Sequence, residues 1–281
     1  VPDADFALEV GDGAAWELWP VKSDTGRDVF LPFFAQDATK TQQMKEKQVL
    51  LLPSRSVLDV GLAVVQPLSV KWADKHRMAV WRGSCTGQGS YDSEHWRDQR
   101  RSRLVSLSIK RRDLLDAGFV NPPGADKFVD ASMKIEGFIS PYLTNEQQAQ
   151  YKVIVVVDGN TVADRFAGQL TSGSAVVKME SVHREYWYAD LQPWVHYIPV
   201  REDLSDLEET LEKVLADDEL LLRISTAARA FVLEKLSAQA VRSYWREILA
   251  IYAEHQTLPV HVERGLQPVR KTHHQPYGFN I

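Results

Sequence analysis

The clearest hydrophobic pattern in the chain is the run from Val153 to Val157, five β-branched residues with no polar residue between them. A run of this kind, bounded by turn residues, is typical of a strand buried on both faces of a parallel sheet. The polar turn Asp158-Gly159-Asn160 ends it. The pattern then changes to four-residue spacing and predicts a helix over residues 161–170. Gly173 is placed to end that helix.

Extended segments are predicted next at residues 175–177 and 194–200, so the region is a strand–helix–strand unit. In open α/β sheets, ligands bind beyond the carboxyl ends of the strands. Asp158, Asn160 and Arg165 follow such an end. A cation beside a helix start is one way to hold a phosphate group. The alternative is a surface turn with a solvated arginine.

Shorter apolar stretches at residues 6–10, 29–34 and 49–53 predict strands of a first, small α/β layer. Residues 37–47 are polar and are expected to form a loop or an exposed helix. A further strand is predicted at residues 77–81, followed by the glycine-rich stretch 82–90. Backbone N–H groups can converge in such a loop and cradle a phosphate or another ligand. It lacks the Gly-Lys-Ser/Thr ending of a P-loop.

The segment from Trp96 to Lys110 is predicted to be helical and carries four arginines, at positions 97, 100, 101 and 103. Charge runs are usually solvated faces, so most of these arginines are expected to face water. One arginine turned toward the glycine-rich loop would suffice to neutralise a pyrophosphate. Residues 113–150 show a mixed pattern, with loop signals at residues 121–124.

Three helices are predicted after the central unit, the first with a capping box formed by Ser205 and Glu208. Apolar stripes extend the pattern through residues 218–236 and 238–255. The tail, residues 257–281, is rich in Pro, His and Arg and is interpreted as a poorly ordered end. Its adjacent His273 and His274 lack the spacing of helical metal ligands.

Composition limits the function classes. The chain has 281 residues, and a net charge of −5 argues against a nucleic-acid partner bound by phosphate neutralisation. Cys85 is the single cysteine, so an internal disulfide is impossible. No apolar stretch has the length of a membrane span. The chain begins with Val1, and a membrane association is expected only through an anchor ahead of that residue.

Asp12 lies at the carboxyl end of the first predicted strand, between two glycines that would let a substrate approach. The pair Gly11 and Gly13 resembles the start of a dinucleotide fingerprint, but Trp16 occupies the third glycine position and is too large for it. This mismatch disfavours a nicotinamide oxidoreductase. A plain turn aspartate is the alternative reading of Asp12.

Three sequence blocks, in this order along the chain, resemble the CAP10-like protein O-glucosyltransferases, glycosyltransferase family 90. The blocks are Pro2-Asp3 with Gly11-Asp12; Trp81-Arg82-Gly83-Ser84 with Thr86-Gly87; and a long block made of Asp158-Gly159-Asn160, Arg165-Phe166, Ser172-Gly173-Ser174, Val176, Lys178, Glu180-Ser181, Pro193-Trp194-Val195-His196-Tyr197-Ile198-Pro199-Val200 and Asp203-Leu204-Ser205. The last block is long and specific.

The resemblance implies an α/β fold of the GT-B type, with two Rossmann-like domains facing a cleft and the N-terminal one reduced or truncated here. It implies an inverting enzyme that moves glucose or xylose from a UDP-sugar to a hydroxyl of a protein or glycan, with no metal and no other cofactor. Asp12 matches the general base of the family. The donor-site positions carried over are Ala79, Arg82, Gly83, Ser84, Arg101, Asn160, Thr161, Val162, Ala163, Asp164, Arg165 and Glu180.

Some assignments leave alternatives open. Arg100 and Arg103 compete with Arg101 for the role of the helix arginine. His196 could be proposed as a base, but it lies in an apolar block that favours a structural role. The domains are predicted as residues 1–76 on the acceptor side, 77–240 for the nucleotide sugar, 241–258 as a helix and 259–281 as a tail. The resemblance also implies a location in the lumen of the endoplasmic reticulum or Golgi.

The chain departs from the family after its first apolar layer. The segment from Leu52 to Val57 has no tryptophan, where the family usually has aromatic residues against which the acceptor packs. The alternative function is therefore a catalytically reduced module of the same fold that binds a sugar nucleotide or a partner protein.

Overall fold

The structure is a computed structural model of the chain, and it describes residues 70–87 and 89–255 continuously. Ahead of these it describes short segments at residues 7–8, 21–22, 28–29, 33–35, 38–39, 49–51, 53–54 and 57–58. Asp12 and the tail from residue 256 lie outside the described residues.

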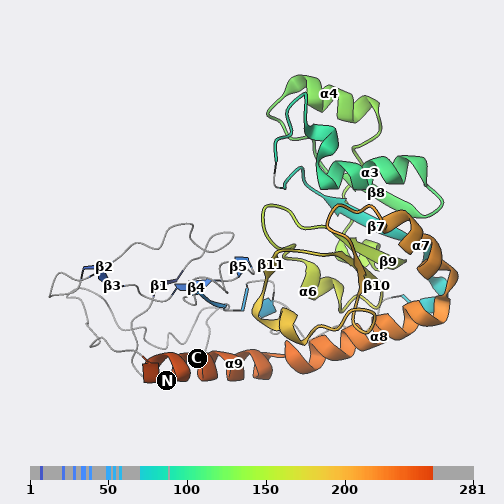
Figure 1. Ribbon diagram of the computed structural model, residues 1–281. Helices are drawn as coiled ribbons and strands as arrows, with labels where there is room; N and C mark the ends of the chain where they lie inside the picture. Colours follow the sequence, from blue (N-terminus) through green and yellow to red (C-terminus); the bar gives the residue numbers. More distant parts are fainter. Residues whose placement is uncertain are drawn as a thin grey trace, which may run out of the picture.

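The centre of the described chain is a five-stranded sheet in the order β12-β10-β9-β7-β8, with all neighbouring strands parallel (Figure 1). Its strands are β7 (His76–Gly83), β8 (Leu115–Phe119), β9 (Tyr151–Val156), β10 (Ala175–Met179) and β12 (Ile198–Val200). The predicted run at residues 153–157 coincides with β9, and its side chains are buried on both faces. The predicted strands at 77–81 and 175–177 are confirmed as β7 and β10.

Helices cover both faces of this sheet. The described helices are α3 (Arg100–Lys110), α4 (Lys127–Ile135), α5 (Asn145–Gln148), α6 (Phe166–Gln169), α7 (Leu207–Ala216), α8 (Asp218–Lys235) and α9 (Ala238–His255), with short 3-10 turns η1 (Trp72–Asp74), η2 (Trp96–Asp98) and η3 (Tyr186–Asp190). The predicted division between residues 240 and 241 falls inside α9. In the described part of the chain, no helix is both long and apolar enough to cross a membrane.

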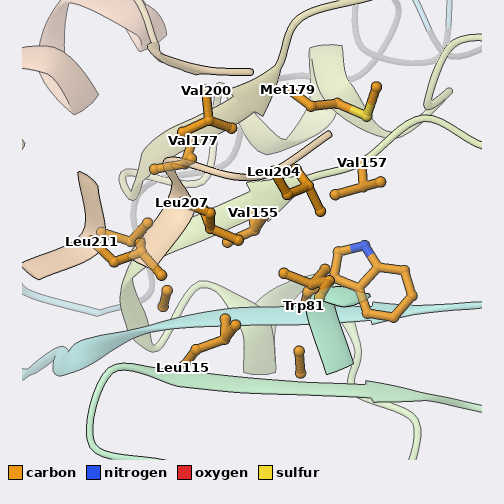
Figure 2. Close-up of a cluster of buried hydrophobic side chains, with 14 of the residues drawn as sticks. Trp81, Leu115, Val155, Val157, Val177, Met179, Val200, Leu204, Leu207 and Leu211 are labelled. Carbon is orange, nitrogen blue, oxygen red and sulfur yellow. The ribbon is translucent and has the colours of Figure 1, made fainter. Parts of the chain in front are cut away.

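The alternation of β9 side chains explains the two hydrophobic cores. Val155 and Val157 point into the core cluster that also contains Leu204, Leu207 and Leu211 (Figure 2). Val156 points the other way, into a cluster built with α6, η3 and α8. A parallel sheet with both faces covered needs apolar residues at every position of its central strand, as found in β9.

Short strands precede the main sheet. They are β1 (Ala7–Leu8), β2 (Val21–Lys22), β3 (Asp28–Val29), β4 (Phe33–Ala35), β5 (Ala38–Thr39) and β6 (Val49–Leu51), while β11 (His183–Arg184) pairs with β5. Strands β1, β4 and β6 form a parallel sheet in the order β1-β4-β6. The α9 residue Tyr244 donates from its hydroxyl to the carbonyl of Leu51, 2.6 Å away. Parts of the predicted strands at residues 6–10, 29–34 and 49–53 are therefore extended in the described residues.

Three local predictions are corrected by the structure. The helix expected over residues 161–170 is confined to α6, because Asp158 Oδ1 accepts a hydrogen bond from Ala163 N (3.1 Å) and folds the preceding residues into a turn. Residues 194–197 form a turn in which Trp194 has a φ of 65°, so only β12 is extended. The Ser205 capping box does not form, since α7 starts after Asp206 with no side-chain cap.

The segment with a mixed pattern also contains β8, which the sequence did not reveal. Asp116 and Gly118 are residues that strands usually avoid. Within the sheet, Asp116 is stabilised by an ion pair with Arg82 of the neighbouring strand, with 2.9 Å between Arg82 Nη2 and Asp116 Oδ1. The strand is therefore supported by a long-range partner and not by its own periodicity.

Candidate functional site

The order of the strands identifies where a ligand should bind. The chain runs from β7 outward to β8 and then returns to the other side of β7 to form β9. In such sheets a crevice opens beyond the carboxyl ends of the two strands at which the direction reverses. A cavity of about 420 Å³ lies there, and we call it cavity A. Its walls come from the ends of β7 and β9 and from the segments after β8 and α4.

The end of β7 needs a glycine because it is crowded. A Cβ atom on Gly83 would lie 2.4 Å from the Trp81 ring and 3.1 Å from Arg165 Nη2. Contacts shorter than 3 Å would force the neighbours to move. Gly83 therefore lets the Arg165 guanidinium approach the end of the strand, where Arg165 donates a hydrogen bond to the carbonyl of Arg82.

Arg101 fixes the two loops of the crevice to each other. Its guanidinium donates to the carbonyl of Ser84 (2.9 Å), after β7, and to the carbonyl of Val157 (3.0 Å), after β9. It also donates to Thr86 Oγ1 at 2.5 Å. A Cβ on Gly159 would lie 3.0 Å from Arg101 Nη2, so the glycine at this position leaves room for the arginine. The Arg101 Nε group is buried and has no hydrogen-bond partner.

The turn after β9 is organised by a buried ion pair. Lys178 Nζ on β10 lies 2.9 Å from Asp158 Oδ1, and both side chains are almost fully buried. The same oxygen holds the N–H of Ala163, as described above. At the tip of the turn, Asn160 Oδ1 accepts a hydrogen bond from the N–H of Gly87 at 3.1 Å. The turn and the glycine-rich loop are therefore joined to each other, and β10 supports them.

The electrostatics of the crevice favour an anion. The pKa of Arg165 is lowered to about 10, first by burial and then by the positive charge of Arg101. Burial also lowers the pKa of Arg101. Both guanidinium groups lie near the Trp81 ring, at 5.7 Å for Arg101 and 6.0 Å for Arg165. Both arginines remain protonated at neutral pH, and an anion placed between them would relieve their mutual repulsion.

Helix α3 adds to this positive field. Its first turn carries Arg100, Arg101 and Arg103 and has no acidic residue, and its N-cap Gln99 makes no side-chain cap. Cations at a helix N-terminus oppose the helix dipole, while anions there are stabilised. A bound phosphate would reverse this unfavourable arrangement. Arg100 pairs with Glu202, and of these three arginines of α3 only Arg101 lines cavity A.

A second cavity of about 450 Å³, cavity B, lies next to cavity A. Thr86 and Arg101 line both cavities. The other walls of cavity B are the start of α3, Asp158, and the residues 201–203 that follow β12. Among the described residues, no cluster of three or more His, Cys, Asp or Glu side chains is arranged to hold a metal ion.

The structure brings most of the predicted donor-site residues together. The following predicted residues line cavity A: Arg82, Gly83, Ser84, Arg101, Asn160, Thr161, Val162, Ala163, Asp164 and Arg165. Arg82, however, uses its guanidinium within the protein, donating to Pro141 O (2.9 Å), to Asp116 O (2.9 Å) and to the Asp116 carboxylate. Its geometry supports a role in holding the crevice together.

Two predicted residues, Ala79 and Glu180, do not line cavity A. Ala79 is fully buried in the core of the sheet, within β7 and four residues before its end, so the fold leaves it no surface for a ligand. Glu180 is exposed just beyond β10 and is not among the described residues that line either cavity. Asp12 lies outside the described residues, and its role stays a prediction. His196 stacks on Phe231 with 4.8 Å between the ring centroids, in agreement with a structural role.

Five residues that line cavity A were not predicted as site residues: Thr86, Val120, Tyr142, Gln148 and Gly159. Thr86 was part of the glycine-rich motif and could have been chosen from it. Tyr142 and Gln148 come from the segment before β9, which carries no motif. Only the path of the chain from β8 back to β9 places them beside the crevice.

The chain is similar in sequence to proteins of one known family. The family model described as Glycosyl transferase family 90 matches residues 62–275. Protein O-glucosyltransferase 2 of Danio rerio is 29% identical over 287 residues, which cover 96% of this chain and 51% of the relative. Protein O-glucosyltransferase 3 of Homo sapiens is 28% identical, with 96% of this chain and 50% of the relative covered. The chain spans about half the length of these two relatives.

Solved structures show a likeness of fold. The crystal structure of TarM superposes with a TM-score of 0.52 at 12% identity, covering 80% of this chain and 47% of TarM. A mutant of S. aureus TarM in complex with fondaparinux, α-GlcNAc-glycerol and UDP gives a TM-score of 0.51 at 11% identity, with 80% of this chain and 48% of that one covered. The likeness confirms the expected fold class, α/β of the GT-B type.

Proposed function

The chain belongs to glycosyltransferase family 90, and we propose that it is an enzyme that transfers glucose or xylose from a UDP-sugar to a hydroxyl group of a protein or glycan. The observation that carries the proposal is the pair of arginines at the crevice. Arg101 and Arg165 converge there, beside the start of α3, at the carboxyl ends of β7 and β9. Two neighbouring guanidinium groups suit the negative charges of a diphosphate.

The donor would bind with its diphosphate between the two arginines. Arginine suits this task because its planar guanidinium binds phosphate oxygens in a bidentate way and stays charged at neutral pH. A hydrogen bond joins Asn160 to the glycine-rich loop, and Gly83 and Gly159 let the arginines approach closely. The site is preorganised, since hydrogen bonds within the protein already fix both loops.

Leaving-group stabilisation is the main catalytic task of these residues. When the bond between the sugar and the diphosphate breaks, negative charge develops on the diphosphate. The charges of Arg101 and Arg165 would stabilise it, and we infer that this makes a divalent cation unnecessary. Preorganised groups aimed at developing charge typically contribute about 10²–10³-fold to the rate for each donor.

The acceptor side of the reaction is proposed from the sequence. Inversion requires the acceptor oxygen to attack the anomeric carbon from the face opposite the diphosphate, and a base must take its proton. Asp12 is the proposed base, and a positioned base contributes roughly 10²–10⁴-fold. Kinship with protein O-glucosyltransferases favours a protein acceptor and a lumenal location, and both are part of the proposal.

The experiment is a UDP-release assay with UDP-glucose and UDP-xylose in the presence of EDTA. It compares the wild type with Asp12→Asn and Arg165→Ala. We expect release by the wild type, none by Asp12→Asn with UDP affinity retained, and strongly weakened UDP binding in Arg165→Ala. If the wild type binds UDP but turns over neither donor, the chain is instead a binding module. Unchanged UDP affinity in Arg165→Ala would remove that residue from the donor site.

A further inference from the structure

Helix α4 has an inner and an outer side of different character. Val129 and Met133, four residues apart, are fully buried in the main core cluster. Phe128 and Ile135 lie outside that core and are 63% and 85% exposed. Apart from Tyr142, the other exposed large apolar or aromatic side chains of the described residues are each less than half exposed. A surface helix usually turns its apolar residues to the core, so the outer pair marks a candidate contact surface.

The exposed residues of α4 have the spacing of a helix–helix contact. Phe128, Ala131 and Ile135 occupy positions i, i+3 and i+7, which lie on one side of a helix, and all three are exposed. Lys127 and Lys134 each precede one of the large apolar residues, so they form one border of the apolar stripe. In heptad terms, the stripe has apolar residues at a, d and a, with lysine at both g positions. We call these five residues the α4 outer face.

The helix that carries this face is held at both ends. Its N-cap Asp126 accepts hydrogen bonds from the N–H groups of Phe128 (2.8 Å) and Val129 (3.3 Å). The chain leaves the helix through Gly137, which has a φ of 78°, and Phe138 then returns to the core. A partner would therefore meet a helix that is already formed, and this removes one of the costs of association.

The charge of the outer face indicates the chemistry of its partner. Lys127 and Lys134 are exposed, and neither side chain has an ion pair or hydrogen bond with another described residue. The acidic residues beside them are engaged elsewhere, because Asp130 accepts a backbone hydrogen bond and Glu136 pairs with Arg97 (2.5 Å). The border of the stripe is therefore positively charged, and acidic residues would complement it.

We propose that the α4 outer face binds an amphipathic helix of a partner protein, with an apolar seam against Phe128, Ala131 and Ile135 and acidic residues against the two lysines. A single helix fits this face better than a groove does, because the inner side of α4 is packed on the core and only its outer side is free. The segments before and after α4 contribute Val120 and Tyr142 to cavity A, which places the partner near the candidate site.

Two other occupants suit this face less well. A second copy bound antiparallel through the same face would bring lysine against lysine. A stripe of three apolar residues also buries far less than the roughly 1,200–2,000 Å² of a stable interface, so the contact should be transient. An anionic membrane needs a wider apolar face or a second anchor, since two basic residues add little to two large apolar side chains.

The test uses a synthetic helix of about three heptads, with leucine at a and d, glutamate at e and g, and alanine elsewhere. Its own glutamates repel each other, so it does not pair with itself. Fluorescence anisotropy of the labelled peptide is measured against the full chain up to about 1 mM, where weak contacts are detected. We expect saturable binding by the wild type, and affinity lower by about tenfold or more in the double variant Phe128→Ser with Ile135→Ser.

A charge reversal tests the acidic part of the proposal. The double variant Lys127→Glu with Lys134→Glu should bind the acidic peptide about tenfold more weakly, because two attractive pairs become repulsive. The same variant should bind a peptide that has lysine in place of glutamate at e and g. A gain of this kind cannot come from misfolding of the variant.

Two control variants leave α4 unchanged. Leu222→Ser with Leu233→Ser replaces two apolar residues of α8 that are 43% and 48% exposed. Lys71→Glu with Lys110→Glu makes the same change in net charge at two other exposed lysines. Neither should change the affinity for the acidic peptide by more than about twofold. The thermal midpoint of each variant shows whether it folds.

The outcomes decide between the occupants. No binding of the acidic peptide by the wild type, or equal losses in the α4 variants and the controls, would overturn the inference. It would also be overturned if Phe128→Ser with Ile135→Ser abolished binding to vesicles of phosphatidylcholine with about a third phosphatidylserine, while the peptide was not bound. A dimer in analytical ultracentrifugation that this variant dissociates would assign the face to a second copy. No nucleotide enters the test, so its result is independent of the proposed function.

Discussion

Buried charged groups are paired differently at the amino edge of the five-stranded sheet, where its strands begin, and at the carboxyl edge, where they end. At the amino edge, Lys75 Nζ donates to Ser174 Oγ (3.0 Å) and to the carbonyl of Ala149, and Lys152 pairs with Asp218. At the carboxyl edge, Lys178 and Asp158 are paired, but Asp158 Oδ2 and Arg101 Nε are left without partners. The polar groups named at the first edge are therefore paired within the protein, whereas two buried atoms at the second edge are not.

The comparison shows that the unpaired buried groups named above lie at the carboxyl edge, beside the candidate site. Unpaired buried groups are expected to lower stability, and native proteins keep few of them. Here one of them belongs to Arg101, whose positive charge also acts on the neighbouring Arg165. The carboxyl edge therefore combines support from β10 with two unpaired buried atoms and two neighbouring positive charges. The predictions below test whether the two edges differ in this way.

The largest effect is expected from Lys178→Met at the carboxyl edge. Removal of one partner leaves the Asp158 charge buried and unpaired, which should lower the free energy of unfolding by about 3–5 kcal/mol. Urea denaturation measures this change. The double variant Lys178→Met with Asp158→Asn should recover part of the loss, because no buried charge is then left alone. A loss below 1 kcal/mol in the single variant would contradict the buried-pair description.

Arg101→Met should weaken UDP binding by about 100-fold. Truncation of a charged side chain that would hold phosphate typically costs 2–5 kcal/mol of binding free energy. The dissociation constant is measured by calorimetry, with Lys152→Met as the matched control at the amino edge. An equal loss of UDP affinity in both variants would erase the distinction between the two edges.

A pH effect should come from the amino edge. Burial lowers the pKa of Lys75 to about 8 in the folded protein, against 10.5 ordinarily. Between pH 8 and 10.5 the unfolded chain therefore binds more protons at this residue, so the free energy of unfolding should rise with pH, on the order of 2 kcal/mol. Denaturation curves at several pH values test this. The rise should be smaller by that amount in Lys75→Met, and equal slopes in the two proteins would refute it.

The smallest effect is expected from Lys152→Met. Its partner Asp218 has a side chain that is 49% exposed, so water already screens the pair. Exposed ion pairs contribute about 0–1 kcal/mol, and the unfolding free energy should fall within that range. Calorimetric unfolding measures it. A loss comparable to that of Lys178→Met would show that the two edges hold charge in the same way.

The strands of the main sheet could be read from the sequence where the signal is local. The apolar run in β9 and the strand before the glycine-rich loop needed no distant information. The helix stripes of α7, α8 and α9 were also readable, because 3.6-residue periodicity is a property of the segment itself. In contrast, β8 depends on the pairing of Asp116 with Arg82, and the shortening of α6 depends on the carboxylate of Asp158.

The sequence by itself therefore determined the fold class, the central strands and the loops that carry the candidate site, since periodicity, turn residues and motifs are local. Only the tertiary structure decided what each charged residue of those loops does. In the folded protein Arg82 is paired with Asp116, Arg101 Nε has no hydrogen-bond partner, and Ala79 lies in the core. The physical reason is that a side chain's role depends on which partners the fold brings within hydrogen-bond distance, and those partners lie far away in the sequence.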